Sequence, residues 1–334
     1  MKKISKTLAC ISSAVMALTV FSAPVFAEGN EYHVGVCQLV QHVALDAATE
    51  GFQEALTEAV EAAGDTVVFD VQNAAGDSAT CSTICNGFVS DGVDLIMANA
   101  TPALQAAQAS TGDIPILGTS VTDYATALDI DDWTGTTGTN ISGTSDLAPL
   151  DQQAALFGEV LPDAKKIGIL YCSAEPNSGY QARVITEELE AISDEYEVTE
   201  YTFADSNDVS QVVTTAVSEV DALYIPTDNT AASNTELIRN IVVPAGIPVI
   251  AGEEGICEGC GIATLSISYA DLGKATGAMA AKVLLDGEDI SEMEVEFAAA
   301  TTKEYNASLC DELGITVPDD YAAIGGDAPE TEAE

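Results

Sequence analysis

The chain has 334 residues, of which 47% are hydrophobic and 19% charged. Ten lysines and arginines stand against 54 acids, giving a formal net charge of -44 at pH 7. This length allows two domains of ordinary size, and the composition supports a full core. The strong negative charge repels phosphate backbones and anionic headgroups, so nucleic-acid binding is excluded from the expected functions.

The N-terminus has the pattern of a secretory signal peptide. Lys2, Lys3 and Lys6 precede residues 7–27, which carry no charge and end in Val25-Phe26-Ala27. Small residues at positions -3 and -1 predict a signal peptide over residues 1–27, cleaved after Ala27. The alternative is an uncleaved anchor. No later segment is long and apolar enough to span a membrane, so we expect an exported protein, in a periplasm or on the exterior of the cell envelope.

The first half of the chain alternates short apolar strands with helical patterns. The periodicity predicts a run of strands and helices in which each strand precedes a helix. The strands are expected at 33–40, 66–71, 93–98 and 114–119, and the helices at 48–60, 78–90 and 101–110. Residues 123–138, which include Trp133, show no period and are expected to be irregular.

The same alternation restarts after Gly143. The expected strands are 166–171, 198–203, 222–225, 247–251, 262–267 and 295–297, and the expected helices are 150–161, 180–192, 209–220, 231–243 and 269–285. Such alternation predicts an α/β fold with two doubly wound parallel sheets. The acidic segment 325–334 has no apolar periodicity and is expected to be a disordered tail.

Motifs of catalysis and nucleotide binding are absent from the sequence. The chain has no phosphate-binding glycine loop, no nucleophile elbow and no His-Glu zinc motif, and its histidines are His33 and His42 alone. We therefore expect no enzymatic activity, no cofactor and no resident metal.

Cysteine usage does not indicate a disulfide framework, because an odd number remains after cleavage. Cys257 and Cys260 form a C-x-x-C, which we interpret as a loop disulfide or two inert thiols, with a metal-ligand pair or a redox motif as alternatives. Cys81 and Cys85 are four residues apart on a predicted helix and are expected to be buried as small hydrophobes. The seven cysteines after Ala27 are Cys37, Cys81, Cys85, Cys172, Cys257, Cys260 and Cys310.

Polar side chains follow the predicted strands of both units. In open α/β sheets ligands bind at the carboxyl ends of the strands, so these positions are candidates for a site in a cleft between two sheets. The candidates are Gln38, Thr101 and Ser120 in the first unit, and Ser173, Asn177, Asp228 and Glu254 in the second.

The two units differ in the chemistry of these candidates. Hydroxyls and helix N-termini gather in the first unit and acids in the second, which suits the two poles of a free amino acid. We expect Asp228 to bind the ammonium, and Thr101 and Ser120 to bind the carboxylate. The alternative for each residue alone is helix capping.

The strand-end blocks resemble those of ABC substrate-binding proteins, in the family that includes tryptophan and tyrosine importers. The matching stretches lie between about residues 32 and 321 and include Val36–Asp46, Gln72–Asp77, Gly143–Asp146, Val220–Thr230 and Ile247–Gly255. The resemblance implies the type I periplasmic-binding fold, with two lobes joined by a hinge of three crossovers. It further implies an aromatic or hydrophobic amino acid as ligand, an ABC permease as partner, and the seven candidate residues as cleft residues.

From the restart after Gly143 and the last long helix, the expected lobes are residues 31–145 plus 269–290 and residues 146–268 plus 291–324. We expect a monomer. Two alternatives stay open: the same fold binding a sugar, nucleoside or peptide, and a metal-handling protein that uses Cys37, Cys172 and His42 as soft ligands. The low aromatic content of 6% favours an amino acid over a sugar.

Overall fold

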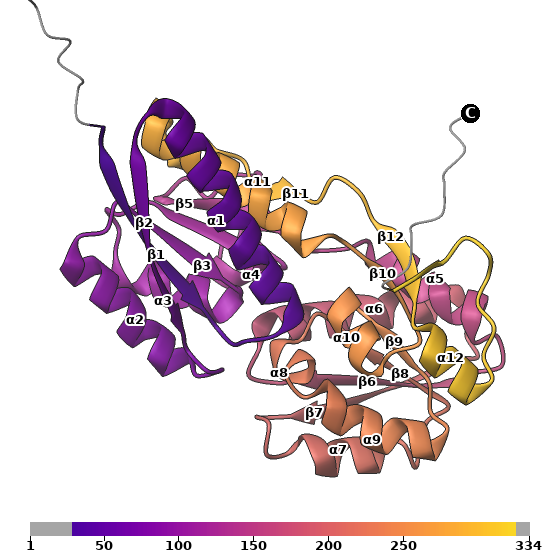
Figure 1. The fold of residues 1–334 in the computed structure, drawn as a ribbon. Helices are drawn as coiled ribbons and strands as arrows, with labels where there is room; N and C mark the ends of the chain where they lie inside the picture. Colours follow the sequence, from indigo (N-terminus) through magenta and orange to yellow (C-terminus); the bar gives the residue numbers. More distant parts are fainter. Residues whose placement is uncertain (1–28, 325–334) are drawn as a thin grey trace, which may run out of the picture.

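The computed structural model describes residues 29–324, which fold into two α/β lobes (Figure 1). The expected signal peptide and acidic tail lie outside the described residues. Within residues 29–324, no helix has the length and apolar character needed to cross a membrane.

The first lobe is built on a six-stranded sheet in which every pairing is parallel. Its strand order is β11-β5-β4-β3-β1-β2. The strands are β1 (Glu31–Gln38), β2 (Thr66–Asn73), β3 (Leu95–Asn99), β4 (Ile116–Val121), β5 (Ile141–Ser145) and β11 (Glu296–Phe297).

Helices cover both faces of this sheet. Helix α1 buries Leu45, Phe52 and Leu56 at helical spacing, and it packs against α11, which comes from much later in the chain (Figure 1). The contact between the two helices is close, because a Cβ added to Gly273 would lie 2.0 Å from the carbonyl oxygen of Ala48. The helices of this lobe are α1 (Val43–Ala63), α2 (Ser78–Asp91), α3 (Thr101–Ser110), α4 (Tyr124–Leu128) and α11 (Tyr269–Ala281), followed by η1 (Lys282–Asp286) and η2 (Ile290–Glu292).

The second lobe has a seven-stranded sheet in the order β13-β12-β10-β9-β8-β6-β7. Its pairings are parallel except that of β10 with β12. The strands are β6 (Lys166–Cys172), β7 (Glu197–Phe203), β8 (Ala222–Ile225), β9 (Val249–Ala251), β10 (Ala263–Ser266), β12 (Thr302–Tyr305) and β13 (Ala322–Ala323). The helices are α5 (Leu150–Val160), α6 (Pro176–Ile192), α7 (Val209–Ala216), α8 (Asn229–Ala232), α9 (Thr235–Ala245), α10 (Glu254–Cys260) and α12 (Ala307–Leu313).

The chain crosses between the two sheets after β5, after β10 and after β11. The third crossing corrects the expected lobe boundary, because residues 291–297 stay with the first lobe. Strand β11 pairs with β5, Val295 is buried in the core of the first lobe, and the Ser142 hydroxyl donates to the Met293 carbonyl at 3.0 Å. Residues 295–297 join a strand that is far away in the sequence, so their apolar character alone could not predict which sheet they belong to.

Other segments also differ from the sequence-based expectation, including residues 123–138, which contain the short helix α4. Cys257 and Cys260 lie on the short helix α10 rather than in a loop. The single helix expected at 231–243 is two helices, α8 and α9.

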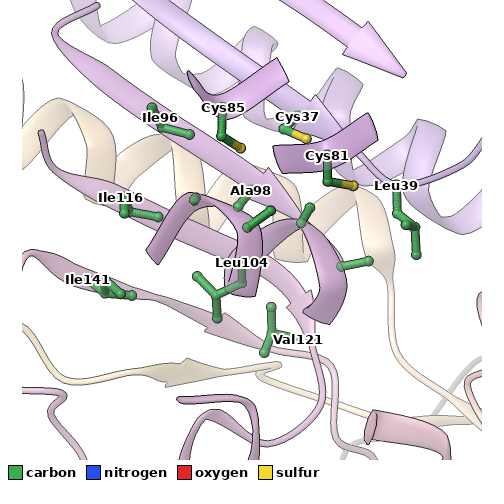
Figure 2. Close-up of a cluster of buried hydrophobic side chains, with 14 of the residues drawn as sticks. Cys37, Leu39, Cys81, Cys85, Ile96, Ala98, Leu104, Ile116, Val121 and Ile141 are labelled. Atoms are coloured by element: carbon green, nitrogen blue, oxygen red, sulfur yellow. The ribbon is translucent and has the colours of Figure 1, made fainter. Parts of the chain in front are cut away.

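The cysteines are packed as hydrophobic side chains, and all seven among the described residues are free and buried. Cys37 lies beside Cys81 and Cys85 in the core between the sheet and α2 (Figure 2). Contacts with the thiols of Cys81 and Cys85, together with burial, raise the pKa of Cys37 far above that of an ordinary thiol. Cys81 and Cys85 therefore behave as core residues, as expected.

Candidate functional site

The carboxyl ends of the parallel strands meet between the lobes around a small polar pocket, called here the polar core. Its open space is about 10 Å³, which is close to the minimum that holds one water-sized group. The lining residues come from both lobes and from the hinge: His42, Leu45, Ser120, Asp146, Asn177, Thr227, Asp228, Asn229, Ala232, Glu253 and Tyr269.

Two lobe 2 carboxylates of the polar core also cap helices. Asp228 accepts the backbone N–H of Ala231 at 2.7 Å, which caps α8, and that of Cys172 at 2.6 Å. Glu253 caps α10 by accepting the N–H groups of its first turn, including that of Gly255 at 2.6 Å. Backbone hydrogen bonds therefore hold both carboxylates in place without a ligand.

Asp146, just after β5, is the third carboxylate. It accepts the hydroxyls of Thr122 at 3.0 Å and Tyr269 at 2.9 Å. Glu175 lies behind the core and accepts the side chain and the backbone N–H of Asn229, at 2.6 and 3.0 Å.

The polar core gathers three carboxyl groups without a cationic side chain, since neither Lys nor Arg of residues 29–324 lines it. Burial, with the nearby Glu175 charge as a further cause, raises the pKa of Asp228 to about 8. Burial raises the pKa of Glu253 to about 7, and it also raises the pKa of Asp146. These shifts mean that the closed pocket disfavours three uncompensated charges and would gain from a bound cation.

Several buried polar atoms at the site have no hydrogen-bond partner among residues 29–324. Ser120 Oγ, Asn177 Oδ1 and His42 Nδ1 are such atoms, and all three residues line the polar core. Thr101 Oγ1 is also buried without a partner, at the start of α3. Because buried polar groups are normally paired, unpaired ones gathered in one pocket indicate a place where a polar ligand binds.

Hydrogen bonds cross the cleft beside the polar core. His42 Nε2 lies 3.2 Å from Asn229 Oδ1, and the Thr122 and Thr227 hydroxyls lie 3.4 Å apart. Gln181 Nε2 donates to Thr122 Oγ1 at 3.3 Å. The two lobes are thus closed on each other.

A larger cavity, called here the outer cavity, adjoins the polar core at Asn229 and measures about 280 Å³. Its wall combines apolar side chains of both lobes with polar groups of the loops after β2 and β7. The lining residues are Leu39, Val40, Ala75, Gly76, Asp77, Ser78, Pro102, Cys172, Ala174, Glu175, Ala204, Asp205, Ser206, Asn207, Asn229, Thr230 and Ser233.

Of the seven candidate residues, Ser120, Asn177 and Asp228 line the polar core, and Thr101 lies next to Pro102 of the outer cavity. Three others line neither space. Gln38 is bonded within the first lobe, where its amide donates to Asp46 at 2.6 Å. Ser173 is exposed and donates to the Phe203 carbonyl, and Glu254 is half-buried beyond the core.

Sequence reasoning missed Asp146, Glu253 and Tyr269 and considered His42 only as a metal ligand. Glu253 rather than Glu254 faces the polar core because α10 begins there. Asp146 follows β5, a strand that periodicity did not indicate.

The metal-site alternative is not supported. Among residues 29–324 there is no group of three or more His, Cys, Asp or Glu side chains able to hold a metal ion. Cys37 lies in the lobe 1 core, whereas Cys172 lines the outer cavity and His42 lines the polar core.

Comparison with known proteins identifies relatives over most of the chain. A curated tyrosine-binding protein from Clostridioides difficile (strain R20291) is 37% identical over 266 residues, which cover 80% of this chain and 76% of the relative. At 13% identity and a TM-score of 0.57, a branched-chain amino acid binding protein from Streptococcus pneumoniae shares the fold, which is the expected type I periplasmic-binding fold.

Two solved structures bear on the arrangement of the lobes. An ABC domain from Streptococcus pneumonia in complex with L-Trp matches with a TM-score of 0.81 at 32% identity, covering 86% of this chain and 96% of that one. The ligand-free, open structure of a substrate-binding protein with adhesive properties from Clostridium difficile matches with a TM-score of only 0.65. Its sequence identity is 37%, and the match covers 89% of this chain and 100% of that one. The protein thus resembles a ligand-bound relative more than an open one, in agreement with the hydrogen bonds across its cleft.

A family model described as ABC transporter substrate binding protein matches residues 33–326. This match spans both lobes and confirms the family expected from the strand-end blocks. The chain belongs to the ABC transporter substrate-binding proteins.

Proposed function

We propose that this substrate-binding protein captures an aromatic amino acid, tyrosine or tryptophan, and presents it to an ABC permease. The observation that carries the proposal is the acidic polar core, which has no cationic side chain from residues 29–324 and shares Asn229 with a neighbouring cavity of about 280 Å³. A space of this size suits a small molecule such as an amino acid. Support also comes from the relatives, one named as tyrosine-binding and one solved with L-Trp.

The two poles of the ligand find different partners. Asp146, Asp228 and Glu253 create a field that attracts the ammonium. The carboxylate binds the unpaired hydroxyls of Ser120 and Thr101, close to the N-terminus of α3. The side chain occupies the outer cavity.

Binding of one ligand by both lobes favours closure. The ligand gains contacts in the closed form that the open form lacks, so it shifts the population toward closure. Nothing in this process requires chemical change of the ligand, and we propose that the protein performs none. The mature protein, cleaved after Ala27, acts as a monomer outside the cytoplasm.

Titration calorimetry on the mature chain tests the proposal after bound ligand has been stripped by unfolding and refolding. The panel contains tyrosine, tryptophan, phenylalanine, leucine, a pentose, a nucleoside and a dipeptide. We expect heat from the aromatic amino acids and recovery of unchanged ligand by mass spectrometry. Binding of only the sugar, nucleoside or peptide, or conversion of the amino acid, would contradict it.

A further inference from the structure

The size of the polar core indicates which part of a ligand enters it. A space of about 10 Å³ holds one water-sized group, and an ammonium is such a group. The rest of an amino acid requires the neighbouring outer cavity. This inference therefore rests on the proposed function and concerns the atoms that contact the ammonium.

The carboxylates of lobe 2 are not the unoccupied acceptors. Both oxygens of Asp228 and both of Glu253 accept backbone N–H groups. They contribute negative potential to the pocket, while the atoms without any partner belong to neutral side chains.

Asn177 is the first of these neutral acceptors. Its Nδ2 donates to the Thr227 carbonyl at 2.9 Å, and this bond orients the amide. Its Oδ1 is left as a buried acceptor without a partner, on a side chain that is 5% exposed and lines the polar core.

His42 is the second acceptor, and its tautomer follows from a chain of hydrogen bonds. Glu175 can only accept when ionised, so its 2.6 Å contact with Asn229 Nδ2 places Asn229 Oδ1 toward His42. Asn229 Oδ1 is an acceptor, so His42 Nε2 must carry the proton in their 3.2 Å hydrogen bond. In a neutral imidazole Nδ1 is then a bare acceptor, and this atom is buried without a partner.

Burial lowers the pKa of His42, although the Asn229 contact and the charges of Glu175 and Asp46 oppose this. The neutral ring is therefore the form present in the closed protein near pH 7.

We propose that the ligand ammonium donates hydrogen bonds to His42 Nδ1 from lobe 1 and to Asn177 Oδ1 from lobe 2. The two acceptors lie on opposite sides of the cleft, so the amino group joins the lobes directly. Glu175 and Asn229 are positioning residues for this contact, because they fix the tautomer of His42. Asp146, Asp228 and Glu253 supply the surrounding negative potential.

A cycle of two ligands and three proteins tests the contact. L-Tyrosine and 3-(4-hydroxyphenyl)propanoate, which lacks the amino group, are titrated into wild type, His42→Phe and His33→Phe. His33 is the matched control, because it is the other histidine of the chain and is exposed on β1. We expect His42→Phe to weaken the binding of L-tyrosine by about 10–100-fold, which is the loss expected for one hydrogen bond to a charged group. His33→Phe should match wild type.

The analogue separates a ligand contact from a structural role. The affinity for the analogue should be similar in wild type and His42→Phe, because the analogue has no ammonium that could contact His42. Equal weakening of both ligands by His42→Phe would overturn the proposal and assign His42 a structural role in closure. If wild type binds neither L-tyrosine nor L-tryptophan, the proposed function itself fails.

Nitrogen NMR of the ¹⁵N-histidine-labelled protein with L-tyrosine gives an independent readout. Two imidazoles are present, and His33→Phe assigns them. We expect liganded His42 to be neutral with its proton on Nε2. A proton on Nδ1, or on both nitrogens, would overturn the inference even where affinities change as expected.

Discussion

The two edges of the cleft are built from corresponding strand ends but use their polar side chains in opposite ways. In the second lobe Asp228 and Glu253 already accept backbone N–H groups and cap α8 and α10. In the first lobe Thr101 and Ser120 keep buried hydroxyls without a partner.

This difference separates a residue's contribution to stability from its contribution to binding. The acids of the second lobe stabilise the fold by capping helices, and this role also places carboxyl groups at the cleft. The hydroxyls of the first lobe stabilise little in the empty protein and are available to a ligand. Substitutions on the two sides should therefore affect different measurements.

The largest effect on stability is expected for Asp228→Ala. Its removal leaves the buried N–H groups of Cys172 and Ala231 without acceptors, so the free energy of unfolding should fall by about 1–3 kcal/mol. Urea unfolding of the ligand-free protein measures this change. The exposed Asp194→Ala in the same lobe should stay within about 0.5 kcal/mol of wild type. Unaltered stability with lost affinity would show that the capping role is unimportant.

Ser120→Ala should give the reverse pattern. Because its hydroxyl has no hydrogen-bond partner among residues 29–324, the free energy of unfolding should change by less than about 0.5 kcal/mol. The affinity for L-tyrosine should fall by about tenfold, as a charged ligand oxygen loses a donor. Calorimetry and urea unfolding together measure both, with the exposed Ser90→Ala as control. Unchanged affinity would remove Ser120 from the site.

The acids should make closure of the empty protein depend on pH. In the closed form burial raises the pKa of Asp228 to about 8 and that of Glu253 to about 7, whereas water reaching them in the open form restores values near about 4. Closure thus takes up protons, so it is favoured at low pH and loses this contribution as pH rises through about 7 to 8.

Small-angle scattering of the ligand-free protein measures this effect. We expect a larger radius of gyration at pH 8.5 than at pH 5, with a smaller change in Glu253→Gln. A radius that is constant, or that falls with pH, would contradict the link between these acids and closure.

The smallest effect is expected for Glu254→Gln. Its side chain lines neither the polar core nor the outer cavity, so ligand affinity should match wild type within about twofold. The pH dependence of closure should also persist. A large loss of affinity in calorimetry would return Glu254 to the site that sequence analysis proposed for it.

Local patterns along the chain were enough to predict the alternation of strands and helices and the family. The bounds of α3, residues 101–110, follow from local signals, because Pro102 and the apolar periodicity are features of contiguous residues. The blocks after the strands also placed Ser120, Asn177 and Asp228 at the cleft, since the ends of parallel strands share one edge.

The rest of the site depends on contacts between segments that are distant in the sequence. Strand β5, with the sequence Ile-Ser-Gly-Thr-Ser, has no apolar run, and it is a strand because β4 and β11 pair with it on either side. Its position brings Asp146 into the polar core. Periodicity indicates only burial along one segment. The tautomer of His42, which makes Nδ1 an acceptor, is set by Asn229, and that residue lies 187 residues away in the sequence. Such contacts arise when distant segments meet, so no local pattern in the sequence records them.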